Sequence, residues 1–229
     1  MTLKYDVVVA GSGPAGAAAA FRASQNGASV LLVEKRKEIG YPVQCGEYFP
    51  KSHEMTDLLP NNKHTEIINN ISPKMIDLKT RDLAVISPTG KEYFFNLDAY
   101  VIDRQKFDQK LADNAIKHGA DVKVNTRAKN ISNNGKSLII DDGEKIQNVE
   151  TDVLIAADGA LSRIGKSQGF DILESAYNYS PVVQFLMTNL DIDSSIVEMY
   201  FGREYCPGGY AWIIGAFVAW ITYYLLAKK

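Results

Sequence analysis

Cysteine and histidine are scarce in this chain of 229 residues, which contains two cysteines and three histidines. Cys45 and Cys206 lie far apart in the sequence, so they do not form the framework of several disulfides that staples small secreted domains. No cysteine or histidine cluster has the spacing of a metal site, and we expect no bound metal. A chain of this length can bury a sizeable core without such staples.

An excess of positive charge is also missing. The 25 Lys and Arg residues stand against 27 Asp and Glu residues, for a net charge of -2, and we therefore expect no nucleic-acid partner. Charge blocks, low-complexity segments and internal repeats are absent, which argues against disorder and solenoid folds. Residues 1–6 lack the basic and hydrophobic regions of a signal peptide, so a cytoplasmic protein is expected.

What the chain does contain is a strand–turn–helix–strand pattern near its start. Residues 5–10 form a continuous apolar, β-branched run, of the kind that is buried on both faces of a parallel sheet. Residues 17–23 are strong helix formers, and residues 29–34 form a second apolar strand that ends in a carboxylate. Between the first strand and the helix lies a G-x-G-x-x-G sequence, Gly11-Ser12-Gly13-Pro14-Ala15-Gly16.

This motif, in this context, predicts a dinucleotide site. Gly11 makes the tight turn, Gly13 lets the backbone approach a pyrophosphate, and Gly16 lets the helix pack closely on the strand. The helix N-terminus offers free N–H groups to the phosphates. Glu34 stands 18 residues after Gly16, where a carboxylate accepts hydrogen bonds from ribose hydroxyls and disfavours the 2′-phosphate of NADP. The motif alone does not separate FAD from NAD.

The middle of the chain departs from a simple nicotinamide dehydrogenase. Residues 35–50 read as a long loop with Gly and Pro, where a helix would usually follow the second strand. Residues 75–78, 83–86 and 92–95 look like short strands. The pattern predicts an α/β fold, in which an antiparallel layer is inserted into a doubly wound, Rossmann-like domain.

A helix over residues 103–119 is predicted by apolar residues at helical spacing, with Asp103 as its N-cap and Gly119 just after its last turn. A strand at 120–124, a hairpin pattern at 129–149 and a buried strand at 151–157 follow. The last strand ends in Asp158-Gly159, which is well placed for a dinucleotide ligand. Asp158 could equally be a turn or helix-capping residue.

Together these residues resemble the FAD-dependent hydroxylase superfamily with the glutathione-reductase-type fold. Three local features are similar to the geranylgeranyl reductase family within that superfamily. Two of them are the Tyr41-Pro-Val-Gln-Cys45-Gly46-Glu47 loop and the Asp103-Arg104 helix start. The third is Cys206-Pro-Gly-Gly-Tyr210-Ala-Trp212, which is similar to the family's Pro-x-x-Tyr-x-Trp-x-Phe-Pro motif. The resemblance covers residues 1 to about 213.

The resemblance implies an FAD cofactor bound in an extended form. The residues implied to contact it are Gly11, Gly13, Ala15, Gly16, Glu34, Cys45, Gly46, Arg104, Ala128, Asp158 and Gly159. The glycine turn would hold the pyrophosphate, and Glu34 would hold the adenosine ribose. Cys45 and Gly46 would lie near the flavin, Arg104 would contact the cofactor from its helix, and the backbone at Ala128 would meet the adenine.

The activity implied is the reduction of isolated C=C bonds in geranylgeranyl chains of archaeal-type membrane lipids or prenyl precursors, with hydride from the reduced flavin. The partners would be a prenylated lipid, an electron donor that is ferredoxin or NAD(P)H, and the membrane surface as a peripheral contact. Tyr210 and Trp212 either line the lipid cavity or belong to ordinary core. Cys45 is either a redox or proton-donating group beside the flavin or a packing residue.

The resemblance divides the chain into an FAD-binding domain over 1–72 and 98–170, a partial substrate domain over 73–97 and 171–213, and an atypical apolar tail over 214–229. Ile214 and Gly215 occupy the Phe and Pro positions of the family motif, and the family's later Gly-Asp segment does not follow. We therefore expect a fold that is incomplete at the C-terminus.

The uncharged residues 210–227 allow three interpretations. They could be a membrane-spanning helix, since they just reach the necessary length. They could be core strand and helix of an incomplete domain, or out-of-register sequence from a truncated gene.

Two other functions fit the same motifs. An FAD-dependent monooxygenase or halogenase of an aromatic substrate would share the glycine turn, Glu34 and Asp158-Gly159. An inactive nucleotide-binding fragment would keep the turn and lack the later Gly-Asp segment.

Overall fold

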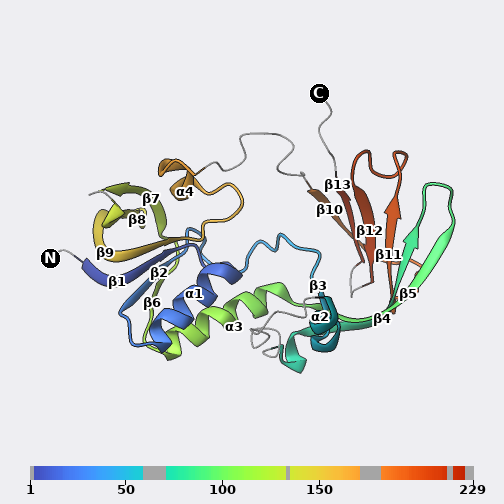
Figure 1. The fold of residues 1–229 in the computed structure, drawn as a ribbon, viewed down its shortest axis with the longest axis horizontal. Coiled ribbons are helices and arrows are strands. Elements are labelled where there is room, and N and C mark those ends of the chain that lie inside the picture. The colour runs from blue at the N-terminus through green and yellow to red at the C-terminus, as the bar shows by residue number, and fades with distance from the viewer. Residues whose placement is uncertain (1–2, 59–70, 133–134, 171–181, 216–218, 225–229) are drawn as a thin grey trace. The chain divides into compact units, whose positions relative to one another are not determined.

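The computed structural model describes residues 3–58, 71–132, 135–170, 182–215 and 219–224 (Figure 1). The chain forms two compact units, each built from two segments. Unit 1 contains Met1–Val43 and Gln105–Glu174, and unit 2 contains Gln44–Arg104 and Ser175–Lys229. The domain borders expected at 72/73 and 97/98 fall inside unit 2. The assignment of residues to an FAD-binding domain and a substrate domain stays a prediction.

Unit 1 is organised around a six-stranded sheet in the order β6-β2-β1-β9-β8-β7. The strands are β1 (Leu3–Ala10), β2 (Val30–Val33), β6 (Asp121–Lys123), β7 (Arg127–Ser132), β8 (Ser137–Asp141) and β9 (Ile146–Ala156). β1 is parallel to both β2 and β9, and β2 is parallel to β6. β7, β8 and β9 form an antiparallel meander. The parallel half therefore contains the expected Rossmann-like arrangement.

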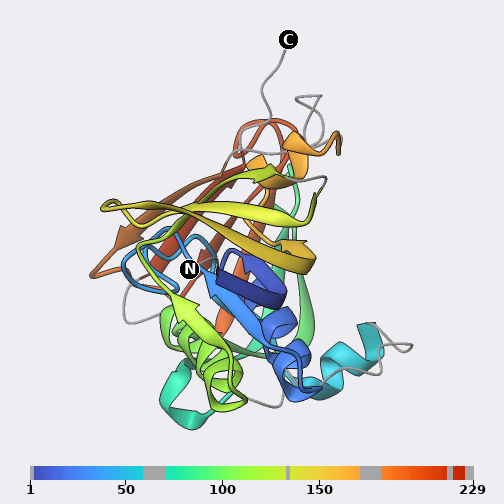
Figure 2. The same ribbon diagram turned by 90° about the vertical axis from the view of Figure 1, so that its left-hand side faces the viewer.

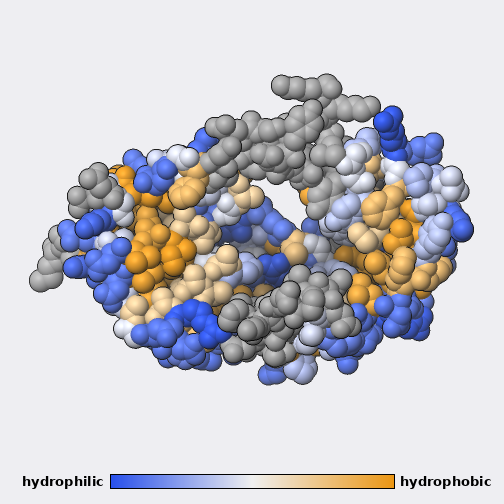
Figure 3. Space-filling model, in the orientation of Figure 1, coloured by the Kyte–Doolittle hydropathy of each residue, from blue (hydrophilic) through white to orange (hydrophobic). Residues whose placement is uncertain are grey.

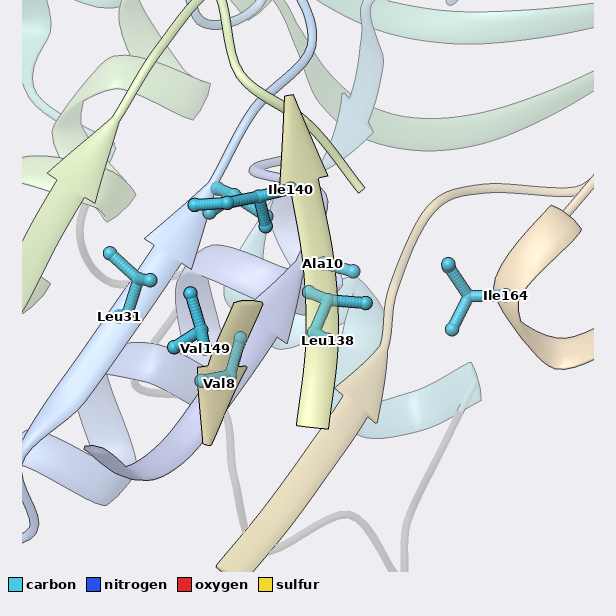
Figure 4. Packing of buried hydrophobic residues seen from close by; sticks show 8 residues of the cluster. Val8, Ala10, Leu31, Leu138, Ile140, Val149 and Ile164 are labelled. Carbon is cyan, nitrogen blue, oxygen red and sulfur yellow. The ribbon is translucent and has the colours of Figure 1, made fainter. Parts of the chain in front are cut away.

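The central strands of unit 1 are covered on both faces. The helices α1 (Pro14–Gln25) and α3 (Arg104–Lys117) lie on one side of β1 and β2 (Figure 2). Side chains of β7 and β8 pack on the other side, and β9 pairs with β1 within the sheet. Alternate side chains of β1 and β2 point to these two layers. One buried cluster contains Val7, Val9, Ala20, Val30, Leu32, Ala115 and Ala120. The other contains Val8, Ala10, Leu31, Val33, Leu138, Ile140, Val149 and Ile164 (Figure 4).

Unit 2 is a seven-stranded sheet in the order β10-β13-β12-β11-β4-β5-β3. Its strands are β3 (Tyr48–Pro50), β4 (Ile76–Ile86), β5 (Glu92–Ile102), β10 (Val182–Met187), β11 (Ile196–Phe201), β12 (Tyr210–Ile214) and β13 (Ala219–Tyr224). The neighbours are antiparallel except β11 and β4. The helix α2 (Ser52–Leu58) and the 3-10 turn η2 (Pro73–Met75) complete the described elements. The predicted antiparallel layer is therefore present.

Among the residues that the structure describes, unit 2 buries fewer large side chains than unit 1. Val101, Val197 and Ile214 form a buried cluster, against which Tyr48, Leu78, Leu83 and Trp212 pack. Several apolar side chains of its strands stay exposed, namely Tyr93, Phe94, Phe95, Val182, Val183, Phe185 and Met187. On the face drawn in Figure 3, apolar side chains reach the surface in both units.

Several elements differ in extent from their predictions. The helix predicted at 103–119 is confirmed as α3, and Gly119 adopts the left-handed φ of +93° that ends it. The short strands predicted at 75–78 and 83–86 are one strand, β4, with register shifts against β5. The strand predicted at 151–157 is the second half of β9, which begins at Ile146 and also pairs with β8.

The apolar tail contains strand rather than helix where the structure describes it. β12 pairs with β13 over Ala211–Ile214, and β13 also pairs with β10. The interpretation of 210–227 as one membrane-spanning helix is therefore wrong for 210–214 and 219–224. Within the described ranges, no helix is long and apolar enough to cross a membrane. Residues 216–218 and 225–229 lie outside the described residues.

Candidate cofactor site

Two glycines of the turn between β1 and α1 are required by the protein's own packing. Gly11 has a φ of +103°, and a Cβ there would lie 2.3 Å from the carbonyl oxygen of Ala157. A Cβ on Gly16 would lie 1.8 Å from the carbonyl oxygen of Gly11 and 3.1 Å from Cβ of Ala157. Gly11 therefore makes the turn, and Gly16 brings α1 against it, as the motif predicts.

No contact within the protein requires a glycine at position 13. A Cβ added there would meet no atom within 4 Å. Gly13 is the N-cap residue of α1, Pro14 follows at the start of the helix, and Ala15 is exposed in the first turn. The first N–H groups of a helix have no partners within it. The turn thus leaves free space directly at a helix N-terminus, which fits a pyrophosphate.

Glu34 holds the glycine turn from the end of β2. The residue is buried, with 9% of its surface exposed. One oxygen, Oε2, accepts the backbone N–H of Ser12 at 2.9 Å, and Oε1 accepts the N–H of Arg36 at 3.0 Å. A carboxylate has about four acceptor positions, so Glu34 retains capacity for the ribose hydroxyls expected there. The sequence indicated the ribose contact and gave no sign of the bond to the turn.

Ser12 is a residue of this turn that the sequence prediction missed. It is 1% exposed, and within the described part of the chain its Oγ has no hydrogen-bond partner. Buried hydroxyls are normally paired. An unpaired hydroxyl inside the glycine turn is a second observation that fits a polar group bound nearby.

Asp158 caps a helix in this structure. Its Oδ2 accepts the N–H groups of Arg163 at 2.7 Å and Ile164 at 3.1 Å, and its Oδ1 accepts the hydroxyl of Ser162. Ser162 in turn accepts the N–H of Gly165 at the start of α4 (Arg163–Ser167). These contacts are those of the capping alternative. The cofactor contact expected of Asp158 and Gly159 stays a prediction.

Ala128 lies on β7, the outer strand of the unit 1 sheet, opposite Ile140. A polar pocket of about 180 Å³ lies beside this strand. It is lined by Lys35, Asn125, Arg127, Asp141, Asp142 and Gly143. Lys35 and Arg127 of this lining neighbour Glu34 and Ala128 in sequence, but Glu34 and Ala128 themselves are not among the lining residues. Direct contact of Ala128 with adenine stays a prediction.

In unit 2 the structure brings Cys45, Gly46 and Trp212 together. A Cβ on Gly46 would lie 3.1 Å from Nε1 of Trp212 on β12. Gln184 of β10 donates from Nε2 to the carbonyl oxygen of Cys45 at 3.3 Å. The rings of Tyr210 and Trp212 are 5.3 Å apart between centroids. Trp212, one of the two residues expected at the substrate, therefore packs on the loop expected at the flavin, and Tyr210 lies beside Trp212.

Arg104 begins α3 and connects to the same loop. Its backbone N–H donates to Oε1 of Glu47 at 3.2 Å. Glu47 is 8% exposed, and sequence reasoning did not single it out for the site. Burial raises the pKa of its carboxyl group, which the N–H of Arg104 partly opposes. Cys45 itself is half-buried.

Comparison with known families agrees with these features. The family profile described as FAD dependent oxidoreductase matches residues 6–160. The chain belongs to this FAD-dependent oxidoreductase family. A second profile, the geranylgeranyl reductase catalytic domain, matches residues 178–215 of this oxidoreductase, a range that includes β10, β11 and β12. FAD is the family's cofactor, and the free space at Gly13 fits it.

Among curated relatives, the oxidoreductase is 37% identical to the digeranylgeranylglycerophospholipid reductase of Methanosarcina acetivorans, over 91% of this chain and 51% of that protein. It is 37% identical to the enzyme of the same name from Methanocaldococcus jannaschii, over 91% of this chain and 52% of the relative. The chain thus spans about half the length of the curated relatives it matches.

A solved structure supports the same relationship. A geranylgeranyl bacteriochlorophyll reductase-like protein from Thermoplasma acidophilum superposes with a TM-score of 0.84 at 31% identity. The match covers 98% of this chain and 57% of that protein. The flavin-dependent brominase Bmp2 shares only the fold, with a TM-score of 0.66 at 17% identity.

Proposed function

We propose that this oxidoreductase is part of an FAD-dependent reductase that saturates isolated C=C bonds in the geranylgeranyl chains of membrane lipids. The observation that carries the proposal is the packing of Trp212 against Gly46. Trp212 lies in the segment that matches the geranylgeranyl reductase catalytic domain, and Gly46 lies in the loop expected at the flavin. The relatives named above are reductases of digeranylgeranylglycerophospholipid.

The roles of the residues follow from their positions. Gly13 and the first turn of α1 would receive the pyrophosphate, and Glu34 would accept the ribose hydroxyls. Tyr210 and Trp212 would form part of an apolar wall for the prenyl chain and exclude water from it. Bound flavin supplies hydride when it is reduced, and the protein supplies orientation and a dry surface.

The remaining partners are also part of the proposal. A prenylated lipid would be the substrate, and ferredoxin or NAD(P)H would be the electron donor. A lipid substrate would bring the protein to the surface of the cytoplasmic membrane as a peripheral contact.

Cofactor binding is tested first, by titrating the purified chain with FAD and following flavin fluorescence. The wild-type chain should bind FAD, whereas Gly13→Ala should bind it at least tenfold more weakly, because the added methyl group occupies the space left for the pyrophosphate. Equal binding by both proteins would remove Gly13 from the site. A chain that retains no flavin would contradict the proposal that residues 1–229 bind their cofactor.

Substrate chemistry is tested without oxygen. Dithionite-reduced chain with FAD is incubated with digeranylgeranylglycerophospholipid, and the lipid mass is measured. A gain of two hydrogens for each double bond supports the reductase. Turnover of an aromatic substrate that requires oxygen, with no change in lipid mass, would show a monooxygenase or halogenase instead.

A further inference from the structure

Glu47 connects the loop of Cys45 and Gly46 to the start of α3 through three different atoms. Its backbone N–H donates to Sγ of Cys45 at 3.4 Å. Its carbonyl oxygen accepts the N–H of Ile102, at the end of β5, at 2.9 Å. Its side-chain Oε1 accepts the N–H of Arg104 at 3.2 Å. All of these atoms lie within unit 2.

The backbone of Glu47 is unfavourable for its residue type. Its φ is +60°, in the left-handed region that glycine adopts without penalty. In this region the Cβ of a residue other than glycine crowds the backbone, which destabilises the conformation. The side chain must therefore contribute something that glycine could not. The contact between its carboxylate and Arg104 is the candidate.

The surroundings of Glu47 also disfavour the ionised form of its carboxylate. Burial raises the pKa of Glu47, and the negative charges of Asp77 and Asp103 raise it further. The N–H and the guanidinium of Arg104 act in the opposite direction. Removing a charge from water is expensive unless it is well paired. A neutral side chain would have a smaller desolvation cost at this position, so stability alone does not explain why the residue is a glutamate.

We propose that Glu47 is a positioning residue, which fixes the Cys45–Gly46 loop relative to the first residue of α3. This inference rests on the proposed function in one respect, namely that Cys45, Gly46 and Arg104 are the unit 2 residues expected at the cofactor. On this proposal a single buried side chain sets the arrangement of all three. Loss of its contact releases the loop and exposes the thiol of Cys45.

The reactivity of Cys45 gives a measurement that needs neither cofactor nor turnover. The rate of alkylation by iodoacetamide is measured at pH 7.5 in the full chain carrying Cys206→Ser, so that Cys45 is the remaining thiol. Glu47→Ala should raise the rate at least fivefold. Glu47→Gln should stay within twofold of the parent, because the amide oxygen can still accept the N–H of Arg104.

Glu54 offers a matched control. Its Oε1 accepts the backbone N–H of Asp98 at 3.0 Å, so it also joins two segments of unit 2 through one carboxylate. Glu54→Ala should leave the alkylation rate within twofold of the parent. The proposal is overturned if Glu47→Ala also stays within twofold, or if Glu54→Ala accelerates the reaction as much. Should Glu47→Ala fail to fold, Glu47→Asp replaces it under the same criteria, because its shorter side chain does not reach Arg104.

Flavin binding separates the failure of this inference from that of the proposed function. If the chain binds FAD, Glu47→Ala should weaken binding at least fivefold, and Glu47→Gln should restore it to within twofold. Unchanged FAD binding in Glu47→Ala would overturn the link to the cofactor. Absence of FAD binding by the parent chain would count against the proposed function, while the alkylation rates would still decide whether Glu47 positions the loop.

Discussion

The two units contain sheets of similar size that bury their side chains very differently. In unit 1, Val8 and Val9 are both 0% exposed although they point to opposite faces of β1. In unit 2, the neighbouring Phe94 and Phe95 of β5 are 59% and 53% exposed. The central strands of unit 1 lie between helices and a meander, whereas the described residues of unit 2 leave parts of both sheet faces open. A substitution should therefore cost far more stability in unit 1.

The largest effect is expected at the glycine turn of unit 1. Gly16→Ala should lower the free energy of unfolding by more than roughly 4 kcal/mol, because the new Cβ would overlap the Gly11 carbonyl group and the backbone must move. Gly13→Ala is the control, and it should change the free energy by less than roughly 0.5 kcal/mol. Urea denaturation followed by circular dichroism measures both. Equal losses would mean that Gly13 also serves the fold.

A second pair of variants tests the contrast between the sheets directly. Leu138 is 0% exposed in the unit 1 core (Figure 4), so Leu138→Ala should cost about 2–5 kcal/mol. Phe95→Ala, at an exposed position of unit 2, should cost less than about 0.5 kcal/mol. The same denaturation experiment compares them. A large loss at Phe95 would show that this face is covered in solution.

A smaller effect is expected at the cap of α4. Ser162→Ala removes the oxygen that accepts the N–H of Gly165, and it should cost about 1 kcal/mol. FAD affinity should stay within twofold, since the variant leaves the glycine turn intact. Thermal unfolding and FAD titration measure the two quantities. A strong loss of FAD affinity would instead assign the segment after β9 to the cofactor site.

The smallest effect is the pH dependence that Glu47 contributes to unit 2. Its folded-state pKa is raised, so its stabilising contribution is present below the unfolded pKa and is lost as pH rises through the folded pKa. Glu47→Gln cannot ionise. Its free energy of unfolding, relative to wild type, should therefore increase as pH rises from about 4 to 7. A flat difference across this range in urea titrations would contradict the buried, charged carboxyl.

Local patterns predicted unit 1 better than unit 2. The runs that became β1 and β2 are apolar throughout because both faces are covered, and the glycines between them announce the turn. β4 contains Lys79, Arg81 and Asp82 in its middle, and these charged side chains made one strand look like two. Its length is fixed by pairing with β5 and β11, which a short window of sequence does not contain.

The same reason separates the predicted and the missed parts of the site. The glycine turn and Glu34 belong to one short pattern with known spacing. Glu47 meets Arg104 across 57 positions, and Gly46 meets Trp212 across a still longer separation. No local spacing in the sequence predicts either contact. Asp158 was open to both interpretations because a carboxylate before a helix can cap it or bind a ligand.

The interleaving of the two units has a consequence for how the chain can be made and cut. Ala10 of β1 pairs with Ala156 of β9, and all of Gln44–Arg104 lies between them in sequence. During synthesis from the N-terminus, the edge of β1 that pairs with β9 therefore has no partner strand until β9 has been made. Unit 2 is likewise incomplete until its second segment, Ser175–Lys229, has been made. A single cleavage at any point cannot release either unit whole, so each must be studied within the intact chain.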